Sequence, residues 1–368
     1  MDKMKTITFY LFLGLIAIFS SFGWQQGNET AINLILVAPF FLFFLDFLDK
    51  KPIIFPKLIS LMLCLFLIFL SLGNFYSANF ESSFTASLFY FSLSLFFVHV
   101  YNHKQEIKKT LPTFINLVAL VLIITPFMVS FITKKPFVQP FDDKNLVFPN
   151  HPPHNHLGDF LSGVIVLNLF FLLETFSWKR LILILGFLPS FYFSSSRSAY
   201  VSLIVPAAFL IIGWLKTKKP TLGHSDRAVI ITTLIAIILA GVFFISQPRP
   251  LLSGRPDYFS YALGGITTKP LTGYGLTNFP LVVGQILGKD VPLVQSAHNV
   301  FLNLFAETGL IAGGLFFLIF LIILIRGEKN AFWFIFLSLL VNFQIDYTYR
   351  IPLMLLLFFI VAGTVWKD

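Results

Sequence analysis

The chain has 368 residues, of which 57% are hydrophobic and only 12% are charged, and its mean hydropathy is +0.84. A soluble domain carries about twice that charged fraction. The composition therefore excludes an ordinary soluble domain and predicts a membrane protein. The net charge of +9 indicates basic cytoplasmic loops rather than a nucleic-acid partner, because Lys and Arg collect there in membrane proteins. The single cysteine, Cys64, excludes an internal disulfide bond and a cysteine-rich metal site.

Apolar runs of spanning length predict an all-α polytopic protein with about twelve transmembrane helices, forming a single integral membrane domain over residues 1–368. The runs cover about residues 5–23, 31–48, 58–73, 84–101, 112–133, 157–175, 181–193, 199–215, 228–246, 299–325, 331–345 and 351–366. The first run resembles a signal peptide but has no small-x-small cleavage site, so we interpret it as the first span.

The distribution of Lys and Arg predicts that both termini are cytoplasmic. With that orientation, seventeen of these cations fall on the inner side and nine on the outer side, as the positive-inside rule requires. The first two outer segments hold none of the nine. Because a cation kept on the disfavoured side invites a functional explanation, we expect the second half of the chain to carry the site and the first half to be scaffold.

Polar clusters precede the even-numbered spans, whose N-termini face outward in this topology. NHPPHNHLGD comes before the sixth span, SSSRSAY before the eighth, SAHN before the tenth and DYTYRIP before the twelfth. A helix N-terminus carries unpaired N–H groups and the positive end of the helix dipole. These positions therefore favour binding of an anion.

The longest polar interruption lies between the ninth and tenth spans, and we predict an outer loop over residues 247–298. Its prolines and glycines exclude one long helix, although PDYFSYALGGI after Arg255 is suited to a short one. The loop carries Arg255, Lys269, Tyr274 and His298.

Three side chains are the main candidates for chemistry. Arg197, with Ser196 and Ser198 beside it, and Arg255 are each consistent with an interfacial anchor, but together they suit a phosphate group. His298 is our candidate general base, because the imidazole pKa of about 6.5 suits proton transfer at neutral pH. A purely structural histidine is the alternative.

The segment before the sixth span permits two interpretations. His151, His154 and His156 could bind a metal, but no recognised ligand spacing joins them to nearby acids. We therefore predict no metal and assign Asn155 and His156 as substrate contacts. A glycosidase would need two outer carboxylates at a fixed separation, and no spacing pairs the candidates, which are Asp257, Asp290, Glu307 and Asp346.

The order of SSSRSA, GRPDYFSYAL, KPLTGYGLTNF and SAHNVFLNLFAETGLIAG resembles the O-antigen ligase family, which includes O-antigen polymerases and bacterial protein O-oligosaccharyltransferases. The similarity is best over residues 150–315. It implies a bacterial inner-membrane protein with a periplasmic active site, and cofactor-free, metal-independent transfer of a glycan from undecaprenyl pyrophosphate. Arg197 and Arg255 would contact the pyrophosphate, and His298 would be catalytic.

The resemblance favours O-antigen ligation to lipid A core in lipopolysaccharide biosynthesis, with inversion at the sugar. Alternatives are an O-antigen or exopolysaccharide polymerase and a protein O-oligosaccharyltransferase, because nothing in the chain identifies the acceptor. Further candidate substrate contacts are Ser196, Ser198, Tyr274, Asn299 and Arg350. The expected partners are the lipid-linked donor, the glycan acceptor and membrane lipids.

A transporter or flippase of lipid-linked glycans is the alternative from another class. Such proteins place ionisable residues or broken helices near the bilayer midplane. Asp46, Asp159 and Glu174 map near span ends, which disfavours transport.

Overall fold

We describe a computed structural model of the chain. It describes residues 3–22, 26–50, 52–133, 156–194, 196–217, 255–288 and 294–367, with isolated positions between 223 and 242. All regular elements in this part of the chain are helices, and seven of them are long and apolar enough to cross a membrane. The expected all-helical, multi-pass membrane protein is confirmed at this level.

Eleven of the twelve predicted spans coincide with a helix. These helices are α1 (Lys3–Phe22), α2 (Gln26–Leu48), α3 (Lys57–Asn74), α4 (Phe80–Asn102), α5 (Lys104–Thr133), α6 (Leu157–Glu174), α7 (Trp178–Phe193), α8 (Arg197–Thr217), α12 (Val300–Arg326), α13 (Ala331–Asn342) and α14 (Pro352–Val365). The ninth predicted span, residues 228–246, falls largely outside the described residues. The count of twelve therefore stays a prediction.

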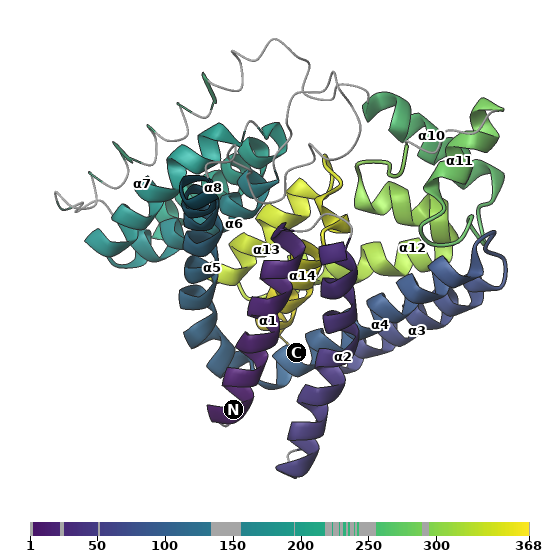
Figure 1. Cartoon of the computed structure of the whole chain (residues 1–368), viewed down its shortest axis with the longest axis horizontal. Helices are drawn as coiled ribbons and strands as arrows, with labels where there is room; N and C mark the ends of the chain where they lie inside the picture. The colour runs from purple at the N-terminus through teal and green to yellow at the C-terminus, as the bar shows by residue number, and fades with distance from the viewer. Residues whose placement is uncertain are drawn as a thin grey trace.

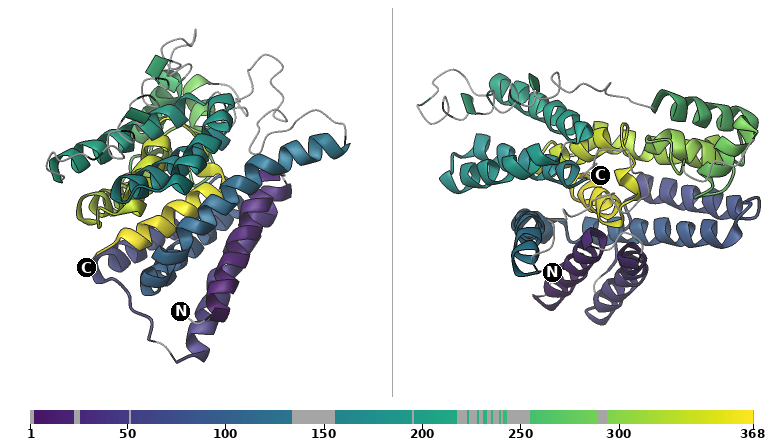
Figure 2. Two further views of the ribbon diagram at one scale, coloured as in Figure 1. Left: turned by 90° about the vertical axis from the view of Figure 1, so that its left-hand side faces the viewer. Right: turned by 45° about the horizontal axis from the view of Figure 1, so that its top comes forward.

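Helix α14 is the centre of the structure. All of its fourteen residues are buried, which explains why its sequence is apolar on every side. It packs against α4 and α13. In Figure 1, α5 to α8 lie on one side of α13 and α14, and α3, α4 and α10 to α12 lie on the other. The two further views in Figure 2 show α1 and α2 side by side along one flank of this assembly.

Helices α6, α8 and α13 pack against one another, and this packing brings the starts of α6 and α8 to the end of α13. Gly158, in the first turn of α6, permits the close approach: a Cβ atom there would lie 2.1 Å from Ser194 Oγ. Polar residues from three distant stretches of sequence therefore meet at one end of the bundle.

Part of the predicted 247–298 loop is helical. The helix expected after Arg255 is confirmed as α10 (Arg255–Thr268), and a second helix that we did not predict, α11 (Phe279–Leu287), follows it. Both pack on α12. Residues 247–254 of the loop lie outside the described part of the chain.

Helix α12 is broken at Gly309, which has a φ of 77°, and the segment between α10 and α11 fills the break. Leu310 donates its N–H to the carbonyl of Pro270 (2.7 Å), and Gly275 donates its N–H to the carbonyl of Glu307 (2.7 Å). The loop thus satisfies backbone groups that the break would leave unpaired. This contact fixes α10 against α12, and so fixes Arg255 relative to His298.

Candidate active site

A buried carboxylate, Asp346, joins the predicted loop to the helix bundle. It lies between α13 and the short 3-10 helix η2 (Thr348–Arg350) and is fully buried. Its Oδ2 atom lies 2.8 Å from Ser198 Oγ and 3.4 Å from a guanidinium nitrogen of Arg255. Its Oδ1 atom accepts the N–H of Tyr347 (2.7 Å) and faces Nδ1 of His298 at 3.8 Å. Two of the three predicted functional residues therefore meet at one acid.

A second buried carboxylate, Asp159 in the first turn of α6, lies beside the first. Its Oδ1 atom accepts hydrogen bonds of 2.8 Å each from Ser196, Ser198 and the Asn342 amide. Its Oδ2 atom lies 3.1 Å from His156 Nδ1. Ser198 thus lies between the two acids, and its single hydroxyl hydrogen serves one of them at a time. The two serines that we predicted as substrate contacts hold carboxylates of the protein.

The backbone at His298 is in the left-handed region, with a φ of 53°, which is uncommon for a residue with a Cβ atom. Its N–H donates to Ser296 Oγ at 3.0 Å, and Tyr258 stacks on its ring with centroids 5.3 Å apart and planes inclined at 13°. Tyr347 meets the ring edge-on at 4.8 Å. Strained residues persist where surrounding contacts fix them, often at functional sites. Because Nδ1 faces Asp346, Nε2 is the nitrogen directed away from this acid.

Two buried hydroxyl groups support the His298 backbone. Ser296 Oγ and the Tyr349 hydroxyl lie 2.5 Å apart. Burial raises the pKa of Tyr349 well above its usual range, since the phenolate form would be desolvated. Tyr349 therefore remains a neutral phenol, and the support of His298 does not change with pH around neutrality.

Arg197 is the first residue of α8 and is half-buried between Ser196 and Ser198. Its neighbours bind Asp159 and Asp346, so the backbone at Arg197 belongs to the same assembly. The start of a helix also supplies unpaired N–H groups. A shared role of Arg197 and Arg255 on one ligand stays a prediction.

Two of the remaining predicted contacts have structural partners, and a third lies outside the described residues. Asn299 caps α12, accepting the Leu302 N–H at 2.9 Å. Arg350 donates to the carbonyl of Gln295. Asn155, together with His151 and His154, lies outside the described residues.

Tyr274 lies in a small hydrophobic cluster of the loop, which also contains Phe279 and Val282. It is 5% exposed and its hydroxyl donates to Gln285 at 2.6 Å, while the Lys269 ammonium lies 4.4 Å from its ring centroid. This position favours a role in packing the loop over the predicted contact with substrate.

His156, Asp159 and Asp346 offer three ligand atoms within 4.8 Å of one another, a spacing that a metal could use. The carboxylate oxygens, however, already accept hydrogen bonds from hydroxyl, amide and backbone groups, and the Arg255 cation lies beside Asp346. A divalent cation at this place would displace those donors and meet the guanidinium charge. The arrangement is better described as a saturated carboxylate network that holds Ser198, Arg255 and His298.

Sequence analysis missed the two acids as site residues. The sequence indicates Asp346 as an outer carboxylate or a partner of Arg350, and Asp159 as an acid near a span end and near the histidines that precede it. Their positions in the sequence could have indicated them as site residues. Asp159 ends one polar cluster and Asp346 begins another, and both clusters precede predicted outward-facing helix starts. What could not be read from sequence was that these helix starts meet.

The helices, seven of them long and apolar enough to cross a membrane, indicate a multi-pass membrane protein, and the polar, partly cationic assembly at one end of them is its candidate site. Residues 181–318 match the family model described as O-antigen ligase. The match supports the O-antigen ligase family and confirms the resemblance that the sequence motifs indicated. The matched region contains Arg197, Arg255 and His298. A search of curated proteins found no match.

Proposed function

We propose that this protein transfers a glycan from undecaprenyl pyrophosphate to an acceptor hydroxyl on the periplasmic face of the inner membrane. The family match supports O-antigen ligase or polymerase activity in general. The observation that carries the specific proposal is the meeting of Arg255 and His298 at Asp346, because a cation and a proton acceptor at one place suit the departure of an anion and the attack of a hydroxyl.

The donor's pyrophosphate would lie against Arg255, Arg197 and the start of α8. Arginine is suited to this role because its planar fork matches phosphate oxygens, and each charge-assisted hydrogen bond contributes about 1.5–3 kcal/mol. Arg255 is 12% exposed at its side chain. Its charge is thus paired with Asp346, and a small part of the side chain remains exposed.

His298 would act as the general base through Nε2. The acceptor oxygen attacks the anomeric carbon, its proton moves to His298, and the bond from that carbon to the pyrophosphate oxygen breaks, with the electron pair leaving on undecaprenyl pyrophosphate. A single displacement of this kind inverts the anomeric configuration. Asp346 would stabilise the imidazolium that forms, as a carboxylate does for the histidine of a catalytic triad.

The test is transfer by purified full-length protein in detergent, using undecaprenyl-pyrophosphate-linked oligosaccharide as donor. His298→Ala is expected to lower the rate by about 10²–10⁴-fold, the usual contribution of a general base. Thr267→Ala, on an exposed position of α10, is the matched control. Full activity of folded His298→Ala would remove the histidine from this role.

The acceptor is resolved by separate arms of the same assay, which offer lipid A core, a second lipid-linked glycan or a protein. We expect lipid A core to be glycosylated, as in O-antigen ligation. A product that grows from lipid-linked glycan alone would instead identify a polymerase. Transfer in detergent needs no second compartment, so a complete lack of product with uptake of donor into sealed vesicles would favour a transporter.

A further inference from the structure

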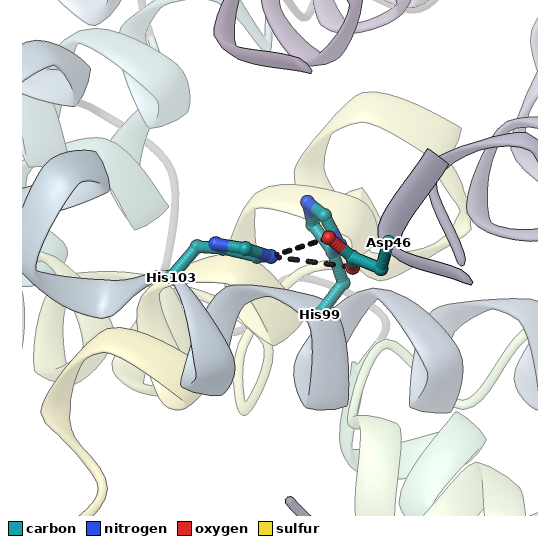
Figure 3. Close-up of side chains that lie close together, drawn as sticks. All are labelled: Asp46, His99 and His103. Carbon is teal, nitrogen blue, oxygen red and sulfur yellow. Dashed lines mark hydrogen bonds and ion pairs between the residues drawn. The ribbon is translucent and has the colours of Figure 1, made fainter. Parts of the chain in front are cut away.

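A second buried carboxylate cluster lies at the other ends of the helices, and we define the Asp46 cluster as Asp46, His99 and His103. Asp46 is in the last turn of α2, His99 is in the last turn of α4, and His103 is the C-cap residue directly after α4. All three are buried, with side-chain exposures of 4%, 0% and 7%. Figure 3 shows the two imidazole rings directed at the carboxylate from adjacent turns of one helix.

The cluster is remote from the candidate active site. The start of α4 contacts the loop, since Ser83 Oγ donates to the carbonyl of Leu276 at 2.8 Å. His99 lies sixteen residues further along α4, which corresponds to about 24 Å of helix. In the predicted topology this is the cytoplasmic end.

The geometry of the Asp46 cluster suits a shared cation. Asp46 Oδ2 lies 3.2 Å from His99 Nδ1 and 3.2 Å from His103 Nε2. The two histidines are four residues apart, so their side chains share a face of α4, and their ring centroids are 4.6 Å apart. All three ligand atoms lie within 4.8 Å of one another. Tetrahedral zinc with ligand bonds of about 2.0–2.2 Å separates its ligands by about 3.3 Å.

A lysine neutralises part of the cluster from the Oδ1 side of the carboxylate, the oxygen that His103 Nε2 also approaches, at 3.0 Å. Lys5 Nζ bonds this oxygen, Asp46 Oδ1, at 2.8 Å and lies closer still to Asp49 Oδ2, at 2.6 Å. Asp49 therefore balances much of the ammonium charge, and Asp46 keeps negative charge for a second cation. The C-terminal ends of α2 and α4 add negative partial charge at the same place.

The tautomer of His99 bears on the proposal. Its Nε2 atom is buried without a hydrogen-bond partner among the described residues, and the ring lies between Phe9 and Phe43. If Nδ1 carries the hydrogen, Nε2 is a buried, unsatisfied acceptor, at a cost of about 1–3 kcal/mol. If Nε2 carries it, the Nδ1 lone pair faces a carboxylate, a repulsion that a cation between them would relieve, while the Nε2–H is then a buried donor without an acceptor at a similar cost.

We propose that Asp46, His99 and His103 bind a divalent transition-metal ion, of which zinc is the best match. Two imidazoles and one carboxylate suit zinc and its neighbours, whereas magnesium and calcium require oxygen ligands. Three protein ligands leave the fourth position for water. The ion would tie α2 to α4 at the end remote from the proposed glycan transfer, so it does not conflict with metal-independent chemistry at His298.

The test measures zinc in full-length protein purified through a tag without histidines and dialysed against zinc-free buffer after loading. Wild type is expected to retain about one zinc ion per chain and to melt at a higher temperature with zinc than after chelation. His99→Gln and His103→Gln are expected to weaken zinc binding by about 100-fold or more, since even outer-shell changes cost 10–100-fold. His156→Ala, in the other cluster, is the control and should keep the ion.

Cobalt substitution supplies a readout of the ligand set, because tetrahedral cobalt has visible absorption bands that change when a histidine ligand is lost. Wild type should show these bands, and His103→Gln should lose them. The proposal would be overturned if the wild-type protein retained no zinc and gained no thermal stability from it. The cluster would then be a Lys5–Asp46 ion pair with two neighbouring histidines. Retention of the ion by both glutamine variants, or its loss from His156→Ala alone, would place it elsewhere and overturn the proposal equally.

Discussion

The two buried carboxylate clusters of this protein differ in what surrounds the acids and in how open they are. The Asp346 cluster, which we define as Asp159, Ser198, Arg255, His298 and Asp346, is gathered from five separate stretches of the chain, whereas the Asp46 cluster comes from two packed helices. At Asp346 the partners reach the surface, with 12% of the Arg255 side chain and 21% of the His298 side chain exposed. At Asp46 no ligand side chain exceeds 7%.

This difference separates two uses of a buried acid. At Asp346, the carboxylate oxygens are occupied by hydrogen-bond donors, and the acid holds Arg255 and His298 where both remain partly exposed. Such an arrangement suits binding of a ligand, as an active site requires. A closed carboxylate faced by two imidazoles suits an ion enclosed by the protein. Burial of a charge is costly unless it is paired, and both acids are paired, Asp46 with Lys5 and Asp346 with Arg255.

The strongest test of the comparison is Asp346→Asn. Loss of the charge should release Arg255 and His298 from a common partner and lower the transfer rate by about 100-fold, the effect of small misplacement of reacting groups. Asp257→Asn, at an exposed acid in the first turn of α10, is the matched control and should retain activity. A folded Asp346→Asn protein with normal kcat/KM would show that the acid is only structural.

A smaller loss is expected from Arg255→Lys. Lysine keeps the charge but loses the planar fork that suits phosphate, and one charge-assisted hydrogen bond of about 1.5 kcal/mol corresponds to roughly tenfold in rate. Arg326→Lys, at the exposed end of α12, controls for the change of residue type. An unchanged rate for Arg255→Lys would indicate that only a point charge is needed.

Gly309→Ala tests the contact that fixes the loop. A Cβ atom at this position would lie 2.2 Å from the Leu271 carbonyl oxygen, and the φ of 77° is unfavourable for alanine. We expect destabilisation of about 1–3 kcal/mol, measured by thermal unfolding in detergent, with a loss of transfer. Gly73→Ala, where nothing lies within 4 Å of the added Cβ atom, should unfold as wild type does. Equal behaviour of the two variants would contradict the described loop contact.

The smallest effect should come from Glu328→Gln, which removes an exposed ion pair away from both clusters. The hydrogen bond from Lys108 lowers the pKa of Glu328, so this pair stabilises the fold above the ordinary carboxyl pKa and loses its effect as the pH falls through the lowered value. Glu328 is 52% exposed, so solvent limits the contribution to less than about 1 kcal/mol. A larger change in melting temperature at pH 7 would show that this surface contact matters more than its exposure suggests.

The sequence predicted the helices well because spanning runs of apolar residues leave a strong signal. It also placed the polar clusters at helix starts, and contacts in the structure join the starts of α6, α8 and α12. The acids at the centre were not predicted, since a single Asp at the end of an apolar run has no local pattern that names its partner. The break at Gly309 was not predicted either. Its apolar surroundings have no local pattern that indicates a break, and the loop residues that fill it come from an earlier segment of the chain.

The metal-type spacing at Asp46 was also hidden from sequence. His99 and His103 are a visible pair at helical spacing, but Asp46 is more than fifty residues earlier and was noted only as an acid near a span end. Packing of α2 on α4 brings it to them. In both clusters, the sequence shows which residue types are present, but only tertiary contacts bring these residues close together.

The most direct test of the central claim, that Asp346 and His298 act as one unit, is a double-mutant cycle on kcat/KM with His298→Ala, Asp346→Asn and the combined variant. Groups that act together are strongly non-additive. We predict that the double variant is no slower than His298→Ala alone. Losses that multiply in the double variant would mean that the two residues contribute independently, and would contradict this account of the site.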